Sequence, residues 1–211
     1  MFLNKKEKIN IILEFLNIKY KDAKCCLVYK KPYELLIAAR LSAQCTDKKV
    51  NEVTKKLFLK YKTLESFSTA FVEDIRKIIY PCGLFNKKAL DVIGICRTLL
   101  KKFNSIVPNN MKQLLSLPGI GRKTANLILG EIYKKPTIVV DTHLIRISNR
   151  LGLVETKNPI EIEKQLEKLI VEEERFSFCH KIIFFGREIC KAKKPICKSC
   201  ELKKICNLGG F

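Results

Sequence analysis

The sequence predicts an all-α protein, and three observations support this prediction. Apolar residues recur at steps of three and four along most of the chain, as in Val92, Cys96 and Leu99, and this is the period of one helix face. The one strand-like run, TIVV at 137–140, is too short to found a sheet. An apolar fraction of 47% in 211 residues is enough for one large globular core or two small ones.

Signals for helix starts follow one another along the chain. We expect an amphipathic helix over 5–20, and Pro32 is expected to begin a second helix as its first-turn proline. Ser68 or Thr69 is expected to cap the helical segment at 70–79. A helix should end before Pro136, so a boundary is expected at 134–136. Further helices are expected to begin near Asp141, Pro159 and Phe176.

Composition favours a nucleic-acid partner. The chain carries 41 Lys and Arg against 21 Asp and Glu, a formal charge of +20, and such a surface attracts polyanions. A Lys-, Ile- and Asn-rich chain also fits a biased genome composition, so charge alone leaves the partner open. The apolar runs fall short of the roughly 20 residues of a membrane span, and the N-terminus lacks the features of a targeting peptide. We therefore expect a cytoplasmic protein with no membrane association.

The segment at 111–133, MKQLLSLPGIGRKTANLILGEIY, predicts a short helix, a tight turn and a second helix. Gly119 and Gly121 permit close backbone approach. The first turn of the second helix offers unpaired amide groups beside the positive end of the helix dipole, an arrangement that binds phosphate. A plain helical corner that uses glycine for compactness is the alternative. Lys123, taken by itself, is typical of a surface lysine that contacts phosphate.

Asp141 stands in VVDTHLIR at a favoured position for a helix cap. Capping amides would hold its side chain as a carboxylate, the form that can face a cationic group. His143, two residues further on, is expected to be structural, with a proton shuttle as the alternative.

The ten cysteines fall into two groups. Four follow the spacing Cx6Cx2Cx5C and predict a metal site, for which both zinc and a [4Fe-4S] cluster are suitable; they are Cys190, Cys197, Cys200 and Cys206. The other six lack ligand spacing and are expected to be small buried apolar residues; they are Cys25, Cys26, Cys45, Cys82, Cys96 and Cys179.

Five motifs together resemble the helix-hairpin-helix DNA glycosylases, and among them the endonuclease III type. They are LSAQCTD (41–47), GLFNKKA (83–89), LPGIGRKTAN (117–126), VDTHLIR (140–146) and the terminal cysteines. The resemblance implies two helical domains with the active-site cleft between them. The central domain would span 25–135, with the hairpin at about 111–134. The second would combine 1–24 with 136–211 and end in an iron–sulfur loop at 190–206 that holds a [4Fe-4S] cluster.

The same resemblance implies a bifunctional DNA N-glycosylase and abasic-site lyase that acts on oxidised pyrimidines in base excision repair. Lys123 would attack the sugar C1′, expel the base and form a Schiff base, after which β-elimination cuts the strand 3′ to the site. Only a neutral amine is nucleophilic; the helix N-terminus, Arg122 and burial under DNA would disfavour the ammonium form. Asp141 would stabilise the oxocarbenium charge and help to deprotonate the lysine or activate a nucleophile.

Extrusion of a nucleotide from duplex DNA leaves a gap that the protein must fill. The resemblance assigns this role to Gln44, which would bond the orphaned base, and to Leu84 as a wedge, with Phe85 as the alternative. The expected partner is double-stranded DNA with a damaged pyrimidine or an abasic site, bound by a monomer. Further DNA contacts are expected from Leu117, Gly119, Gly121, Arg122, Thr124, Lys191, Lys193 and Lys194.

Three alternatives remain at this stage. Adenine and mismatch-thymine glycosylases share much of the pattern, but they tend to lack the lysine of the hairpin. A non-catalytic iron–sulfur protein that binds DNA or senses redox state would explain the charge, the hairpin and the cysteines. It would not explain the joint presence of Lys123 and Asp141. Lesion preference, and whether the cluster is structural or regulatory, stay open.

Overall fold

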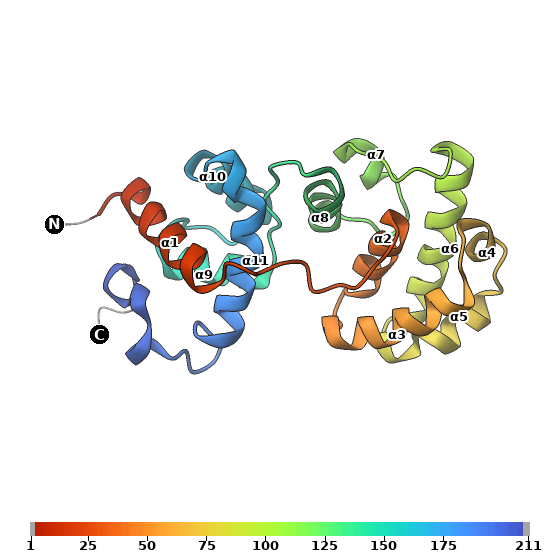
Figure 1. Ribbon diagram of the computed structural model, residues 1–211, viewed down its shortest axis with the longest axis horizontal. Helices are drawn as coiled ribbons and strands as arrows, with labels where there is room; N and C mark the ends of the chain where they lie inside the picture. Colours follow the sequence, from red (N-terminus) through yellow and green to blue (C-terminus); the bar gives the residue numbers. More distant parts are fainter. Residues whose placement is uncertain (1–2, 209–211) are drawn as a thin grey trace. The chain divides into compact units, whose positions relative to one another are not determined.

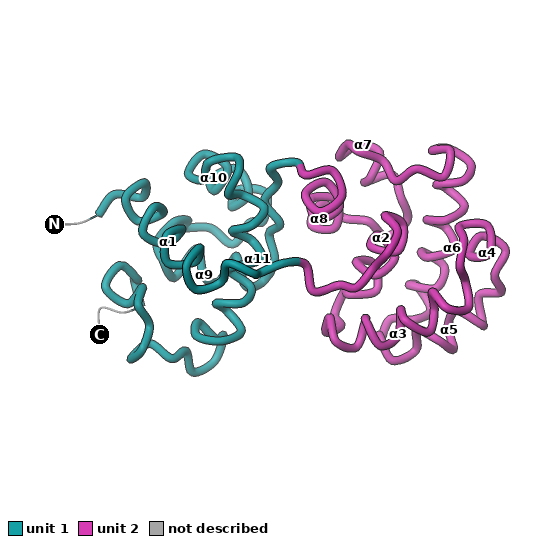
Figure 2. Tube along the Cα trace, in the orientation of Figure 1, with its two compact units in different colours: residues 1–24, 135–211 teal, residues 25–134 magenta. Residues whose placement is uncertain are grey.

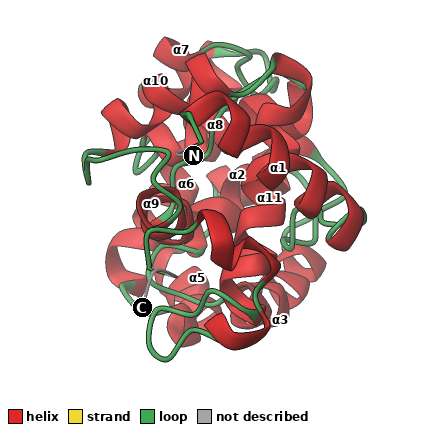
Figure 3. Ribbon diagram, turned by 90° about the vertical axis from the view of Figure 1, so that its left-hand side faces the viewer, coloured by secondary structure: helices red, strands yellow, loops and turns green. Residues whose placement is uncertain are grey.

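The structure is a computed structural model that describes residues 3–208, and in this range its regular elements are all helices, joined by loops (Figures 1 and 3). Between residues 3 and 208 there is no β-strand, and the segment at 137–140 is extended without a strand partner. The prediction of an all-α protein is confirmed. The chain divides into two compact units, residues 25–134 and residues 1–24 with 135–211 (Figure 2).

The unit of residues 25–134 is built around the long helix α6, which packs against α2, α4 and α5. Apolar side chains on these helices are buried together, among them Leu36, Phe67 and Ile95, each at 0% exposure. Its helices are α2 (Pro32–Leu41), α3 (Asp47–Lys60), α4 (Leu64–Ser68), α5 (Val72–Ile79), the 3-10 helix η1 (Tyr80–Cys82), α6 (Phe85–Lys102), α7 (Met111–Leu115) and α8 (Arg122–Tyr133).

In the other unit, α11 packs against both α1 and α9. Phe15 of α1 meets Phe185 of α11 edge to face, with ring centroids 5.7 Å apart. Aromatic pairs of this geometry add to the apolar burial that holds helices together. The helices of this unit are α1 (Lys5–Lys19), α9 (Thr142–Arg150), α10 (Pro159–Leu169), α11 (Glu172–Glu188) and the 3-10 helices η2 (Cys197–Ser199) and η3 (Glu201–Ile205).

Two expected helix starts are wrong. The helix at 70–79 begins at Val72 after Phe71 and has no side-chain cap, because Ser68 and Thr69 instead close the short helix α4, which Thr63 caps. Helix α11 begins at Glu172, four residues before the expected start near Phe176. Three glutamates fill its first turn, where negative charge is favourable. The expected starts at Pro32, Asp141 and Pro159 are confirmed.

Three of the six unclustered cysteines are buried as expected: Cys82, Cys96 and Cys179. The prediction is wrong for the other three, which are only partly buried; they are Cys25, Cys26 and Cys45. All three lie in segments that connect helices, and connecting segments run along protein surfaces.

Candidate active site

The hairpin consists of α7, a turn at 116–121 and α8. Within the turn, the Ile120 amide donates to the Leu117 carbonyl at 3.2 Å, and both side chains are buried. Leu117 is therefore a core residue, so a contact with DNA at this position would have to use its backbone. Gly119 has φ +69°, a left-handed conformation that glycine adopts at no steric cost.

The turn rests on a buried ion pair that joins α2 to α6. Arg40 Nε donates to Asp91 Oδ2 at 2.8 Å, and Arg40 Nη2 lies 2.7 Å from the same oxygen. A β-carbon on Gly119 would stand 2.4 Å from both Arg40 Nε and Asp91 Oδ2, and one on Gly94 would stand 3.0 Å from Pro118 Cγ. Close packing on two helices therefore fixes the turn.

Gly121 differs from Gly119. Its φ is −101°, which any residue adopts, and a β-carbon built on it would meet nothing within 4 Å. Neither backbone strain nor packing among residues 3–208 explains a glycine there. Gly121 is the N-cap of α8 and supplies no side-chain cap, so the start of this helix presents bare backbone to whatever approaches it.

The side chains that follow Gly121 lie at the surface. Lys123 is the second residue of α8 and is exposed, Arg122 is exposed, and Thr124 is half-buried. The nucleophile implied by the sequence thus lies on the first turn of a helix whose start is anchored through the hairpin.

Asp141 is the N-cap of α9, and its Oδ1 accepts a hydrogen bond from the Leu144 amide at 2.8 Å. The chain reaches Asp141 through a buried extended segment in which the Val139 amide donates to Cys179 Sγ at 3.2 Å. Burial raises the pKa of Cys179 to about 12. The sequence predicted the burial of this cysteine but not its contact with the segment that carries Asp141.

Helix α9 is tied to the first residue of the cysteine loop through Arg146. Its Nη2 donates to the carbonyls of Cys190 at 3.0 Å and Gly186 at 3.2 Å, and lies 3.2 Å from His143 Nδ1. A β-carbon on Gly186 would stand 2.6 Å from His143 Nδ1. His143 is therefore packed between Arg146 and α11.

Arg150, one turn further along α9, contacts both ends of the cysteine loop. Its Nη1 donates to Cys190 Sγ at 3.4 Å and to the Lys191 carbonyl at 2.8 Å. Its own carbonyl accepts from Cys206 Sγ at 3.2 Å. Arg146 and Arg150 were not among the predicted site residues, although their spacing of four places them on one helix face after Asp141.

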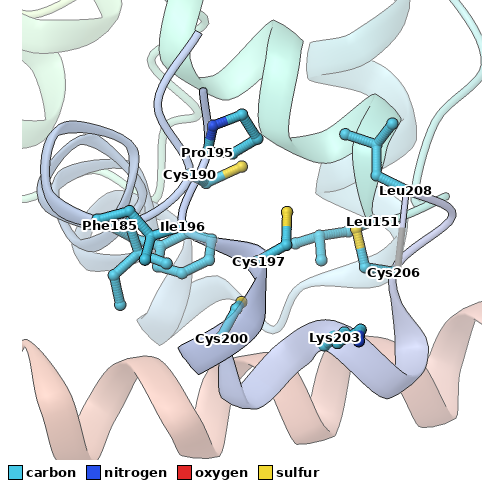
Figure 4. A pocket seen from close by; sticks show the side chains of 11 residues that line it. Leu151, Phe185, Cys190, Pro195, Ile196, Cys197, Cys200, Lys203, Cys206 and Leu208 are labelled. Carbon is cyan, nitrogen blue, oxygen red and sulfur yellow. The ribbon is translucent and has the colours of Figure 1, made fainter. Parts of the chain in front are cut away.

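The four clustered cysteines line one pocket, whose other walls are largely apolar (Figure 4). Burial raises the pKa of Cys200, and charge on the other three thiols would raise it further. Burial therefore favours the neutral thiol, and a bound cation would be needed for these side chains to act as thiolate ligands. In the part of the chain that the structure describes, no group of three or more His, Cys, Asp or Glu side chains is placed so that it could hold a metal ion.

Two surface loops carry the residues expected to enter DNA. Gln44 has φ 55° and is exposed; Leu84 has φ 48° and is 55% exposed. Phe85 is partly buried, and its ring packs against Tyr80 with centroids 4.8 Å apart. In the cysteine loop, the three lysines expected to contact DNA are exposed. No helix within residues 3–208 is long and apolar enough to cross a membrane.

Comparisons with known proteins give a consistent result. Residues 37–172 match the family model of the HhH-GPD superfamily base excision DNA repair proteins. Endonuclease III of Synechocystis sp. is 41% identical over 204 residues, which cover 96% of this chain and 93% of that protein. Endonuclease III of Bacillus subtilis is 39% identical over 208 residues, with 98% and 94% covered.

Solved structures agree with the sequence relatives. A trapped endonuclease III–DNA covalent intermediate superposes with a TM-score of 0.94 at 42% identity and covers 98% of both chains. A thermostable thymine-DNA glycosylase superposes with a TM-score of 0.83 at 25% identity, with 97% and 96% covered. The family model spans more than half of the chain, and the relatives align along nearly all of it. The chain therefore belongs to the endonuclease III family, the DNA glycosylase/lyases of base excision repair within the HhH-GPD superfamily.

Proposed function

We propose that the protein removes oxidised pyrimidines from double-stranded DNA and then cuts the strand 3′ to the abasic site by β-elimination. The observation that carries the proposal is the position of Lys123. It is an exposed amine on the first turn of α8, directly after a turn packed on the Arg40–Asp91 pair. A nucleophile on a fixed helix start can be held in line with a sugar carbon once DNA binds.

In the proposed reaction the neutral Lys123 amine attacks C1′ as the bond from C1′ to the base breaks. The base leaves with a proton, and the attacking nitrogen gives up one of its two protons. The C1′–O4′ bond of the sugar ring then breaks, O4′ takes up a proton, and C1′ and the nitrogen form an iminium that keeps one N–H. This iminium acidifies the C2′ proton; when that proton leaves, the 3′ phosphate departs, and water then releases the lysine. Because Lys123 is exposed in the free protein, burial under DNA would supply the desolvation that favours the neutral amine.

Asp141 is the proposed electrostatic partner. The Leu144 amide donates to one of its oxygens, which fixes the orientation of the carboxyl group at the start of α9. A carboxylate held in this way stabilises the positive charge that develops on the sugar. The Cys179 contact with Val139 supports the segment that positions it.

For DNA binding, we propose that the amides at Gly119, Gly121 and Thr124 meet phosphate, with Arg122 adding positive charge. Gln44 would fill the gap and Leu84 would wedge the stack; its 55% exposure supports Leu84 over Phe85, whose ring is packed on Tyr80. We also propose that the protein acts as a monomer, since one chain supplies all of these groups. The basic residues of the cysteine loop would contact the backbone as well; they are Lys191, Lys193 and Lys194.

We further propose that Cys190, Cys197, Cys200 and Cys206 hold a [4Fe-4S] cluster. Soft sulfur donors in a mostly apolar pocket fit an iron–sulfur group, whose protein ligands are thiolates. Its iron–thiolate bonds would close residues 190–206 into one loop. Arg146 and Arg150 join that loop to α9, the helix that Asp141 caps.

Borohydride trapping tests the mechanism. Wild-type protein, mixed with a duplex that contains thymine glycol or an abasic site, should give a covalent protein–DNA adduct on reduction. Lys123→Ala should give none, whereas the exposed Lys102→Ala should match wild type. An adduct of equal yield from Lys123→Ala, or none from wild type, would show the mechanism to be wrong. A panel of duplexes with different oxidised bases tests the lesion class.

A further inference from the structure

Lys88 of α6 is buried at 0% exposure and points its ammonium group at three backbone carbonyls. Its Nζ donates to the carbonyl oxygens of Leu41 at 2.9 Å, Ala43 at 2.8 Å and Cys82 at 2.8 Å. A lysine ammonium has three donors and no acceptor, so each donor has one partner. This lysine is saturated by backbone and leaves nothing to offer a substrate.

The three carbonyls lie at the bases of the two loops described above. Leu41 ends α2 and Ala43 immediately precedes Gln44; Cys82 ends η1, two residues before Leu84. Carbonyls at the end of a helix lack intrahelical partners and carry the negative end of the dipole. One buried cation therefore joins two loops that are some forty residues apart in the sequence.

Both loops carry strained backbone at their exposed residues. Gln44 and Leu84 have φ values of 55° and 48°, in the left-handed region that residues with a β-carbon rarely adopt. Such conformations persist only where the surrounding structure enforces them. Because both side chains are exposed, their own packing gives little support. Backbone bonds hold each loop to its own helix, as where the Leu84 carbonyl accepts from the Lys88 amide at 3.0 Å, whereas the Lys88 ammonium binds carbonyls of both loops.

We propose that Lys88 is a positioning residue that holds the Gln44 and Leu84 loops in the spacing needed to enter a duplex together. This inference rests on the proposed roles of Gln44 and Leu84 in DNA. Burial lowers the pKa of Lys88, which means that the buried charge costs folding free energy. An apolar side chain of similar length would not have this cost. The presence of a lysine is explained by what its charge holds in place.

The test compares two substrates that differ in their need for the loops. Cleavage at an abasic site in a duplex requires extrusion and gap filling, whereas an abasic site in a single strand requires neither. Lys88→Met should lower the rate on the duplex by at least about tenfold, the scale of lost hydrogen bonds to a charged group. Its rate on the single strand should stay within about twofold of wild type. Lys102→Met, an exposed change in the same helix, should alter neither rate.

Two further measurements separate positioning from general stability. The fluorescence of 2-aminopurine placed opposite the abasic site should rise less with Lys88→Met than with wild type, because fewer Gln44 side chains enter the stack. Lys88→Met should lower the rate of duplex cleavage by a smaller factor in a Gln44→Ala background than in wild type, because the effects of coupled residues are not additive. Lys88→Gln keeps two hydrogen-bond donors, so its rate of duplex cleavage should lie between those of wild type and Lys88→Met.

The outcomes that overturn the proposal are distinct from those that overturn the function. Equal losses on duplex and single strand, in both Lys88 variants, mean that Lys88 supports the whole fold and not the loops. Unchanged duplex cleavage, or fully additive effects with Gln44→Ala, also overturn it. If wild-type protein cleaves neither substrate, the proposed lyase chemistry is wrong instead, and this result needs no variant.

Discussion

A β-carbon on Gly119 would stand 2.4 Å from Asp91 Oδ2. The hairpin turn therefore lies in direct contact with the ion pair beneath it, and the hydrogen atom of glycine is what allows this approach. The contact links the hairpin to α6, and through Arg40 to α2. A disturbance of the pair should reach the start of α8, where Lys123 lies.

Gly119→Ala should lower the stability of the protein, whereas Gly121→Ala should mainly weaken its binding to DNA. At Gly119 the new methyl group meets Arg40 and Asp91 on a left-handed backbone, so the free energy of unfolding should fall by about 1–3 kcal/mol. At Gly121 it meets open space, and the change should stay within about 1 kcal/mol, the scale of a helix-cap substitution. Gly121→Ala should nevertheless weaken duplex binding, because the methyl group would obstruct a phosphate.

Urea unfolding and fluorescence anisotropy with a labelled abasic-site duplex check this pair of variants. Equal stability losses at both positions would contradict the packing argument. Unchanged DNA affinity in Gly121→Ala would show that the amides of the hairpin do not contact DNA.

Local signals account for what the sequence predicted. Pro32 and Pro159 begin helices because a proline suits the first turn, and the PGIG turn follows from Gly119, whose φ of +69° favours glycine. The predicted cap at Ser68 or Thr69 was wrong because these two residues lie at the end of the short helix α4 and not at the start of the next helix. Only the N-cap of α4 at Thr63 distinguishes the two cases.

The residues that support the site could not be predicted from the sequence, and the reason is physical. Arg40 meets Asp91 across 51 positions, and Lys88 meets Leu41 across 47. Each of these residues reads in the sequence as an ordinary polar position on a helix. Periodicity identifies which face of a helix is buried, but it does not show which buried polar groups satisfy one another.

Asp91→Asn should destabilise the protein strongly. The Arg40 and Asp91 side chains are each 9% exposed, so removal of one charge leaves the other buried without its counter-charge, at about 3–5 kcal/mol. The double variant Arg40→Met/Asp91→Leu should recover part of that loss, since an apolar pair leaves no buried charge. Chemical denaturation of Arg40→Met, Asp91→Leu and the double variant measures the coupling; simple additivity would contradict the pairing.

Arg150→Lys should loosen the cysteine loop. A lysine cannot reproduce the contacts that the guanidinium makes with Cys190 Sγ and with the carbonyls of Lys191 and Ala192. Groups that support metal ligands in this way typically change retention by about 10–100-fold. If the loop holds the proposed [4Fe-4S] cluster, its visible absorbance should fade faster in air in this variant, with parallel loss of iron. Arg76→Lys, in an exposed pair with Glu73 on α5, is the control; equal fading in both variants would exclude a specific role for Arg150.

Cys179 should be unreactive in the folded protein. Burial raises its pKa to about 12, so at pH 8 only about one molecule in 10⁴ carries the thiolate, the form that reacts. A raised pKa means that this fraction grows only as the pH climbs toward 12. Iodoacetamide labelling at pH 8 followed by peptide mass spectrometry should leave Cys179 unmodified in native protein and modify it in urea. The partly buried Cys45 is the internal reference, and rapid native labelling of Cys179 would mean that the segment leading to Asp141 opens readily.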